Sequence, residues 1–262
     1  DVSLDWSQRK RLTNLAGALC QLGDFRAEVG NASCVVDYQK AIAIFKRAGE
    51  NSGEAMAEWN LGNAYKDLSQ IRDLEAAESA YKRSLDLLDP NDAWGRSKCI
   101  RQIGLLYFER LVQALERKES PEILENYAQI AEENYITALS ICPAEASGEL
   151  SEIHKKLGNL YLTTHLLKPA RKHYELAAQL EDDIGDRFRA AGARFQLALT
   201  YCREAVEAQG QSQERGNLVR ARAYAEAALR DYEYYGEHAA SQAQVAEELL
   251  NNINQVLSEL GH

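Results

Sequence analysis

Proline and long apolar runs are scarce in this sequence. Only 4 of its 262 residues are proline, so little in the chain would interrupt a helix. No apolar stretch approaches the roughly 20 residues that a transmembrane helix needs, and the N-terminus lacks the basic and then apolar layout of a signal peptide. These absences favour a soluble, helical protein without a membrane partner.

The cysteine pattern and the charge exclude further classes. The 5 cysteines are odd in number, widely scattered and never form a CxxC pair, which argues against a disulfide framework and a structural zinc site. A cytoplasmic location is therefore expected. The formal net charge of -10 disfavours a general nucleic-acid binder, because neutralising phosphates requires a basic field.

Catalytic motifs are also missing. The chain has no GxSxG, Walker-type GxxxxGK[ST], GxGxxG or HExxH motif, so the common hydrolytic and phosphate-binding mechanisms have no anchor. His165 and His173 are not joined by a cysteine or an acidic residue at zinc-ligand spacing, and His154 and His238 are likewise interpreted as surface or partly packed residues. We predict no enzymatic activity and no cofactor.

The sequence does contain a phrase that recurs with variations. Leu61-Gly-Asn-Ala-Tyr65 is followed by related phrases at 103–107, 157–161 and 197–201. A second pattern of small, aromatic and small residues, spaced by four and three positions, belongs to each repeat. Such spacing places the residues on one helical face, where the small positions admit a neighbouring helix. The second pattern reads Ala41/Phe45/Ala48, Ala77/Tyr81/Ser84, Ala131/Tyr135/Ala138, Ala170/Tyr174/Ala177 and, more weakly, Ala221/Ala225/Ala228.

Hydrophobic periodicity predicts five helix pairs and a closing helix. Asn91 or Asp92 is expected to cap the third pair. We predict a single domain over 1–262, with repeats at about 6–50, 53–90, 92–143, 147–181 and 187–236 and a capping helix at 239–260. The predicted helices span 6–22 and 34–48, 53–68 and 74–88, 94–117 and 121–141, 147–164 and 168–180, and 187–208 and 218–235, with linkers at 23–33 and 209–216.

These phrases resemble the tetratricopeptide repeat (TPR), a helix-turn-helix unit of about 34 residues. The second repeat supplies Trp59, Leu61, Gly62, Tyr65, Ala77, Tyr81 and Pro90 of that pattern, and the fourth supplies Leu157, Gly158, Tyr161, Ala170, Tyr174 and Ala177. The resemblance implies an all-α, right-handed superhelix (α-solenoid) of about five TPR-like pairs plus a C-terminal capping helix. Larger insertions in repeats one, three and five predict lengthened helices or loops there.

In the TPR family the first helix of each pair lines a concave groove, and the residues three before and one after the glycine face it. Applied to this chain, those positions and their neighbours predict a peptide-binding groove that is rich in cations. Its candidate residues are Trp59, Asn63, Lys66, Lys98, Arg101, Phe108, Lys155, Asn159 and Phe195.

Two kinds of contact follow from this set. Asn63 and Asn159 each offer a donor and an acceptor to the backbone of an extended peptide. Lys155 with Asn159 resembles half of the clamp by which some family members hold a peptide's C-terminal carboxylate, which suggests a partner with an acidic or carboxylate group. The alternatives are that the cations only solvate a helix face, and that the aromatic residues belong to the core.

The resulting hypothesis is a protein-protein interaction module that binds a peptide segment or partner domain. The alternative is a regulatory or sensor array of a larger bacterial signalling protein. The junction at 181–187 resembles those of arrays attached to STAND-type ATPases and CHAT proteases, and the chain begins without a methionine, as an excised segment would. The oligomeric state is left open.

Overall fold

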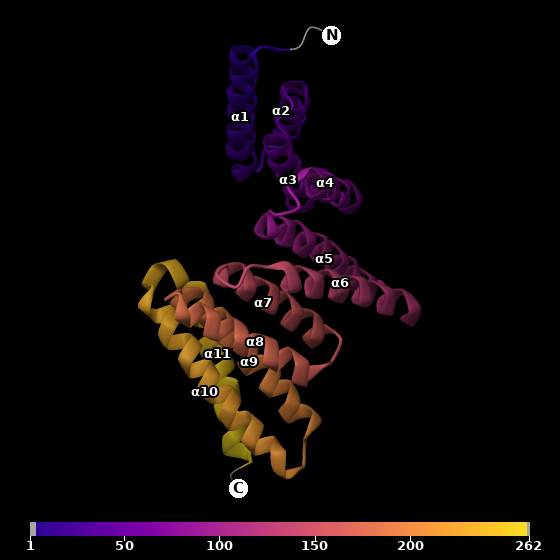
Figure 1. Ribbon diagram of the computed structural model, residues 1–262. Helices are drawn as coiled ribbons and strands as arrows, with labels where there is room; N and C mark the ends of the chain where they lie inside the picture. Colours follow the sequence, from indigo (N-terminus) through magenta and orange to yellow (C-terminus); the bar gives the residue numbers. More distant parts are fainter. Residues whose placement is uncertain (1–3, 261–262) are drawn as a thin grey trace. The chain divides into compact units, whose positions relative to one another are not determined.

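The computed structural model describes residues 4–260, and within this range it consists of α-helices and two short 3₁₀ turns without any strand (Figure 1). Residues 1–3 and 261–262 of the predicted domain lie outside the described range. The helices are α1 (Trp6–Glu28), α2 (Cys34–Ala48), α3 (Asn51–Asp67), α4 (Leu74–Leu87), α5 (Ala93–Glu116), α6 (Pro121–Ile141), α7 (Ser147–Thr163), α8 (Leu167–Asp183), α9 (Arg187–Glu207), α10 (Ser212–Tyr234) and α11 (Ala240–Glu259).

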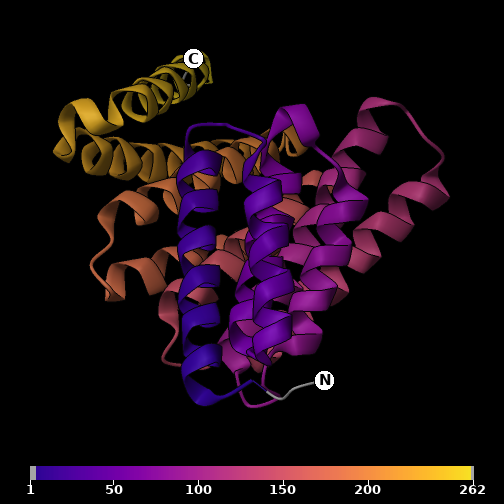
Figure 2. The ribbon, with the colours of Figure 1, turned by 90° about the horizontal axis from the view of Figure 1, so that it is seen from above.

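The chain divides into two compact units, Asp1–Pro143 and Ala144–His262. Unit 1 holds the pairs α1/α2, α3/α4 and α5/α6, and unit 2 holds α7/α8, α9/α10 and the closing helix α11. Within each unit every helix packs against the helices before and after it in sequence, as stacked repeats require (Figures 1 and 2). The predicted all-α solenoid is confirmed. The prediction of one repeat domain over 1–262 stays a prediction.

Most helix boundaries agree with the sequence periodicity, and the exceptions are helices that run further than expected. α1 continues to Glu28 through the segment taken as a linker, and α10 begins at Ser212 within the second predicted linker. Polar composition alone therefore does not end a helix. The insertions in repeats one, three and five are mainly lengthened helices. Asp92, one of the two residues predicted to cap α5, accepts a 2.8 Å hydrogen bond from the Gly95 amide.

Close packing within four of the pairs depends on a glycine of the first helix. A Cβ atom added at this glycine would lie only 2.6 to 2.9 Å from the ring of a tyrosine on the second helix. The tyrosine thus occupies the space that a side chain would need. The four pairs are Gly23 with Tyr38, Gly62 with Tyr81, Gly104 with Tyr135, and Gly158 with Tyr174.

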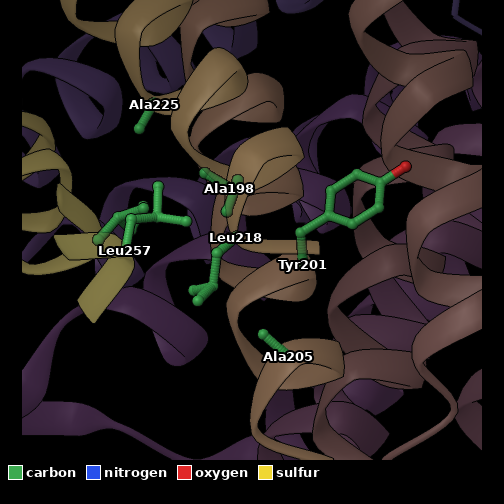
Figure 3. Packing of buried hydrophobic residues seen from close by; sticks show 8 residues of the cluster. Ala198, Tyr201, Ala205, Leu218, Ala225 and Leu257 are labelled. Atoms are coloured by element: carbon green, nitrogen blue, oxygen red, sulfur yellow. The ribbon is translucent and has the colours of Figure 1, made fainter. Parts of the chain in front are cut away.

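The fifth pair has no such tyrosine. Ala198 of α9 and Ala225 of α10 stand at the corresponding positions, and both are fully buried (Figure 3). Leu257 of α11 belongs to the same buried cluster, so the closing helix covers this pair as a capping helix would. With alanine in place of tyrosine, the first helix no longer needs a glycine.

The predicted register of the first repeat is wrong. Its glycine and tyrosine are Gly23 and Tyr38, so the small-aromatic-small pattern is Cys34/Tyr38/Ala41 rather than Ala41/Phe45/Ala48. Phe45 is buried, but its ring lies against Gly53 of the next repeat. The sequence pattern did not reveal the pairing of Gly23 with Tyr38, because Gly23 falls in the predicted linker. In addition, Arg26 stands three positions after the glycine, where the other repeats have a tyrosine.

Two glycine-to-alanine substitutions in unit 1 should have opposite effects. Gly62→Ala should destabilise the protein by about 1–3 kcal/mol, because the new methyl group would overlap the Tyr81 ring. Gly17→Ala, in the interior of α1 with no heavy atom within 4 Å of the added carbon, should stabilise it by about 0.5–1 kcal/mol. Urea denaturation measures both values. Equal effects at the two sites would contradict the role assigned to the glycine.

Candidate interaction surface

The residue after each of these glycines is polar in three of the four pairs, and the packed tyrosine holds it. Tyr38 donates its hydroxyl hydrogen to Asp24 Oδ1 at 2.8 Å. Tyr81 and Tyr174 donate in the same way to Asn63 Oδ1 and Asn159 Oδ1, each at 2.7 Å. The tyrosine therefore fills the space beside the glycine and also fixes the polar side chain that follows it.

This contact decides what the two predicted asparagines offer to a ligand. Asn63 and Asn159 are both half-buried on the first helix of their pair. Their carbonyl oxygens already accept from a tyrosine, so the amide NH₂ group is the part oriented for an external acceptor. The expectation that each amide offers both a donor and an acceptor stays a prediction, and the tyrosine contact sets the direction of the NH₂ donor. The sequence pattern included both tyrosines, but it did not show that their hydroxyl groups bond to the asparagines.

The third pair departs from this arrangement. Leu105 follows Gly104, so Tyr135 meets an apolar side chain where the other tyrosines meet an acceptor. The Tyr135 hydroxyl is buried and has no hydrogen-bond partner among residues 4–260. Burial raises the pKa of this tyrosine well above its ordinary value. The sequence shows that Leu105 replaces the asparagine of the other repeats. It does not show that the Tyr135 hydroxyl is buried without a partner as a result.

Asn63 lies in a cleft of about 310 Å³ that carries a negative charge. Asp24, Glu28 and Asp67 contribute three carboxylates to its lining. Asn60, also in the lining, donates to Asp24 Oδ1 at 2.9 Å. The predicted cation Lys66 forms an ion pair with Asp67 at 2.6 Å. A carboxylate would be repelled here, whereas a basic side chain would be attracted.

In unit 2, Lys155 neutralises a buried acid. Its Nζ atom lies 2.7 Å from Glu152 Oε1 and 2.9 Å from Glu181 Oε1, and the Glu181 side chain is fully buried. Ser151 donates to the same Glu181 oxygen at 2.6 Å, and Arg189 Nε lies 3.3 Å from it. Because removing one partner of a buried ion pair is costly, the ammonium group is committed to the fold.

Glu152 shares this network. Burial alone would raise its pKa, but the hydrogen bond from Lys155 and the charges of Lys155 and Arg189 outweigh that effect and hold the pKa below its usual value. The half-clamp of Lys155 and Asn159 stays a prediction, and its cation is already paired to two carboxylates.

The remaining predicted cations of unit 1 are also occupied. Lys98 Nζ lies 4.9 Å from the ring centroid of Trp59 and 4.4 Å from that of Trp94, which is cation–π geometry. Arg101 is buried, with only 9% of its surface exposed. These contacts support the interpretation that the cations balance and pack within the helical array.

The predicted aromatic residues are half-buried rather than fully presented. Trp59 packs against a core cluster of unit 1 that includes Tyr81 and Leu106, and Phe195 packs against a cluster of unit 2 that includes Tyr232. Phe108 is half-buried on α5. Core packing therefore accounts for much of the surface of Trp59 and Phe195.

Two of the histidines meet between α7 and α8. His154 Nδ1 and His173 Nδ1 are 2.9 Å apart, so one ring donates and the other accepts. The Tyr161 ring lies 5.4 Å from that of His173. Burial, with the nearby charges of His154 and Lys172, lowers the pKa of His173 to about 4, and burial and Lys172 also lower the pKa of His154. Both rings are neutral at pH 7 and form a packed pair.

Across residues 4–260 no three histidine, cysteine or acidic side chains are grouped as a metal ion would require. Over the same range, none of the helices has the combination of length and apolar character needed to cross a bilayer.

Comparison with known proteins informs the fold. No protein-family model matches the sequence, and no curated protein matches it. One solved structure that does match is described as the functional characterization of Pseudomonas aeruginosa PilF, with a TM-score of 0.58. It is 16% identical, and the match covers 96% of this chain and 93% of that one. At this identity the likeness shows the fold alone, and it supports a TPR-like all-α solenoid.

Removing a tyrosine hydroxyl should have different effects in two repeats of unit 1. Tyr81→Phe should cost about 1 kcal/mol, because it breaks the hydrogen bond to Asn63. Tyr135→Phe should cost nothing or stabilise slightly, because its buried hydroxyl has no described partner to lose. Chemical denaturation of both variants measures the difference. An equal loss at both sites would show that Tyr135 has an acceptor after all.

The histidine pair should make stability depend on pH. Between the ordinary pKa of about 6.5 and the lowered value of about 4, His173 is neutral in the folded protein and protonated in the unfolded chain. The unfolded state then binds more protons, so stability falls by about 1–2 kcal/mol, after allowance for solvent screening, as pH drops through this window.

Thermal or urea unfolding across this pH range tests the assignment with the double variant His154→Gln, His173→Gln. Its pH dependence should be flatter than that of the wild type. The exposed His238→Gln is the control and should keep the wild-type slope. An unchanged slope in the double variant would assign the acid sensitivity to other groups.

Proposed function

We propose that this protein is an interaction module that binds extended polypeptide segments along the first helices of the repeats within each unit. The observation that carries the proposal is the recurrent orientation of an asparagine by a packed tyrosine, at Asn63 in unit 1 and at Asn159 in unit 2. Packing between the two helices by itself would need only the aromatic ring of the tyrosine. That the hydroxyl group also orients an asparagine amide at the helix surface favours a binding role.

A fixed amide donor suits the backbone of a peptide. Backbone carbonyl oxygens are present in every sequence, and an NH₂ group held at a known place can donate to one of them. Because the tyrosine already restricts the asparagine side chain, less conformational entropy is lost when the ligand binds. Recognition of an extended segment then depends on main-chain contacts, and the neighbouring side chains supply selectivity.

Selectivity next to Asn63 favours basic or neutral side chains. The cleft carries carboxylates from Asp24, Glu28 and Asp67, so an acidic group would be disfavoured there. Lys66, Lys98 and Lys155 have intramolecular partners, so a partner with a C-terminal carboxylate would have to displace one of them. We therefore infer that a basic segment is a better ligand for the unit 1 cleft than an acidic one.

The alternative proposal, a regulatory or sensor array of a larger signalling protein, rests on the junction at 181–187. Two residues of that junction have structural roles. Glu181 is the buried acid that Lys155 neutralises, and Asp186 caps α9 by accepting from the Arg189 amide at 3.1 Å. The ion pair and the helix cap are thus sufficient to explain why Glu181 and Asp186 are present at this junction. The interaction module is therefore preferred, because it needs no attached signalling domain.

Substitution of both amides by isosteric carboxylates tests the proposal. Asn63→Asp with Asn159→Asp keeps an acceptor for each tyrosine, as Asp24 does for Tyr38, and removes the NH₂ donors. Affinity for a neutral peptide selected from a library of basic, neutral and acidic segments should fall about tenfold, which corresponds to about 1.4 kcal/mol, because the added carboxylates do not attract a neutral ligand and the NH₂ donors are lost.

A control variant separates donor loss from added charge. Asn251→Asp with Asn252→Asp introduces the same two charges at exposed positions of α11 and should bind the selected peptide like the wild type. If the test and control variants bind equally well, the oriented amides are not the binding groups. Selection of predominantly acidic peptides would contradict the preference assigned to the cleft.

A further inference from the structure

One face of α1 is apolar and exposed within unit 1. Leu15, Leu22, Phe25 and Val29 are exposed to 52%, 40%, 62% and 63%, and Ala18 on the same face is exposed as well. Figure 1 shows α2 packed along one side of α1. The residues of α1 that this packing buries, including Ala16 and Cys20, lie on the opposite side of the helix.

The spacing of the exposed residues is that of a helix–helix seam. They follow one another at intervals of three, four, three and four positions, which is the a/d pattern of a coiled coil. An exposed apolar stripe of this kind marks an interaction surface.

We propose that the occupant of this face is α1 of a second copy of the chain, packed antiparallel in a symmetric dimer. The stripe is complementary to itself when the two helices run in opposite directions. Leu15 then lies opposite Phe25 of the partner subunit, and Ala18 lies opposite Leu22 of the partner subunit. Twofold symmetry repeats both contacts, so the small Ala18 faces a larger leucine at the centre of the seam and apolar side chains meet on either side of it.

The charges select the same arrangement. In this register Arg11, next to the stripe, comes to the level of Val29 of the partner subunit and within reach of Glu28 of the partner subunit. Arg11 and Glu28 are both exposed, and neither forms an ion pair with another residue in the described range. A parallel pairing would instead bring like charges together at both ends, which is unfavourable. Complementarity in size and in charge thus favours a second copy over an unrelated helix.

Analytical ultracentrifugation of the full chain over a range of concentrations tests the proposal. The wild type should show a monomer–dimer equilibrium, and Phe25→Glu should abolish it. Val206→Glu places the same charge at an exposed apolar position of α9 and should leave the dimer intact. Circular dichroism confirms that each variant is folded. A wild type that remains monomeric, or a dimer that tolerates Phe25→Glu, would overturn the proposal.

A charge exchange tests the orientation. Arg11→Glu alone and Glu28→Arg alone should each weaken dimerisation about fivefold, because each creates two repulsive contacts per dimer. The double variant Arg11→Glu, Glu28→Arg should restore the wild-type dissociation constant. If the double variant is as weak as the single variants, the antiparallel register is wrong. Binding of the selected peptide is measured separately with Phe25→Glu, which leaves Asn63, Asn159 and the lining of the unit 1 cleft untouched, and it is not expected to change in that variant.

Discussion

The contact between a glycine on the first helix and a tyrosine on the second determines how closely each of four pairs can pack. No Cβ atom fits at Gly23, Gly62, Gly104 or Gly158 because a ring already fills that space. In three of these pairs the hydroxyl group of the same ring donates a hydrogen bond to the residue that follows the glycine. A single packing requirement therefore positions the side chain that we propose contacts a ligand, and stability and recognition depend on one tyrosine.

The electrostatics of the array explain why a chain with many acids still displays cations on its first helices. Glu181 is fully buried and needs Lys155 and Arg189 beside it. Lys66 and Lys98 are similarly held, by Asp67 and by two tryptophan rings. Counting charges along a helix therefore overstates how many of them a partner can use. What remains open to solvent around Asn63 is acidic, so the local field favours a basic partner.

The sequence predicted the fold well because the spacing of small and aromatic residues reports helix packing directly. It identified Gly62 with Tyr81 and Gly158 with Tyr174, and it missed Gly23 with Tyr38 because the surrounding segment looked like a linker. The candidate binding residues were predicted from their spacing to the glycine of each repeat, but the side chains that form ion pairs and hydrogen bonds with them were not predicted. Lys155 and Glu181 are 26 positions apart, and only the folded chain shows that they form an ion pair.

Asp24 and Asn63 occupy equivalent places in consecutive repeats, and a tyrosine hydroxyl donates to both. A carboxylate and an amide have nearly the same shape, so the fold accepts either without rearrangement. The exchange reverses what the position presents outward, from a hydrogen-bond donor to a negative charge. Ligand preference in such an array can consequently change by one chemical group per repeat while the packing beneath it stays the same. A change of binding partner in evolution would then not require a change in how the helices pack.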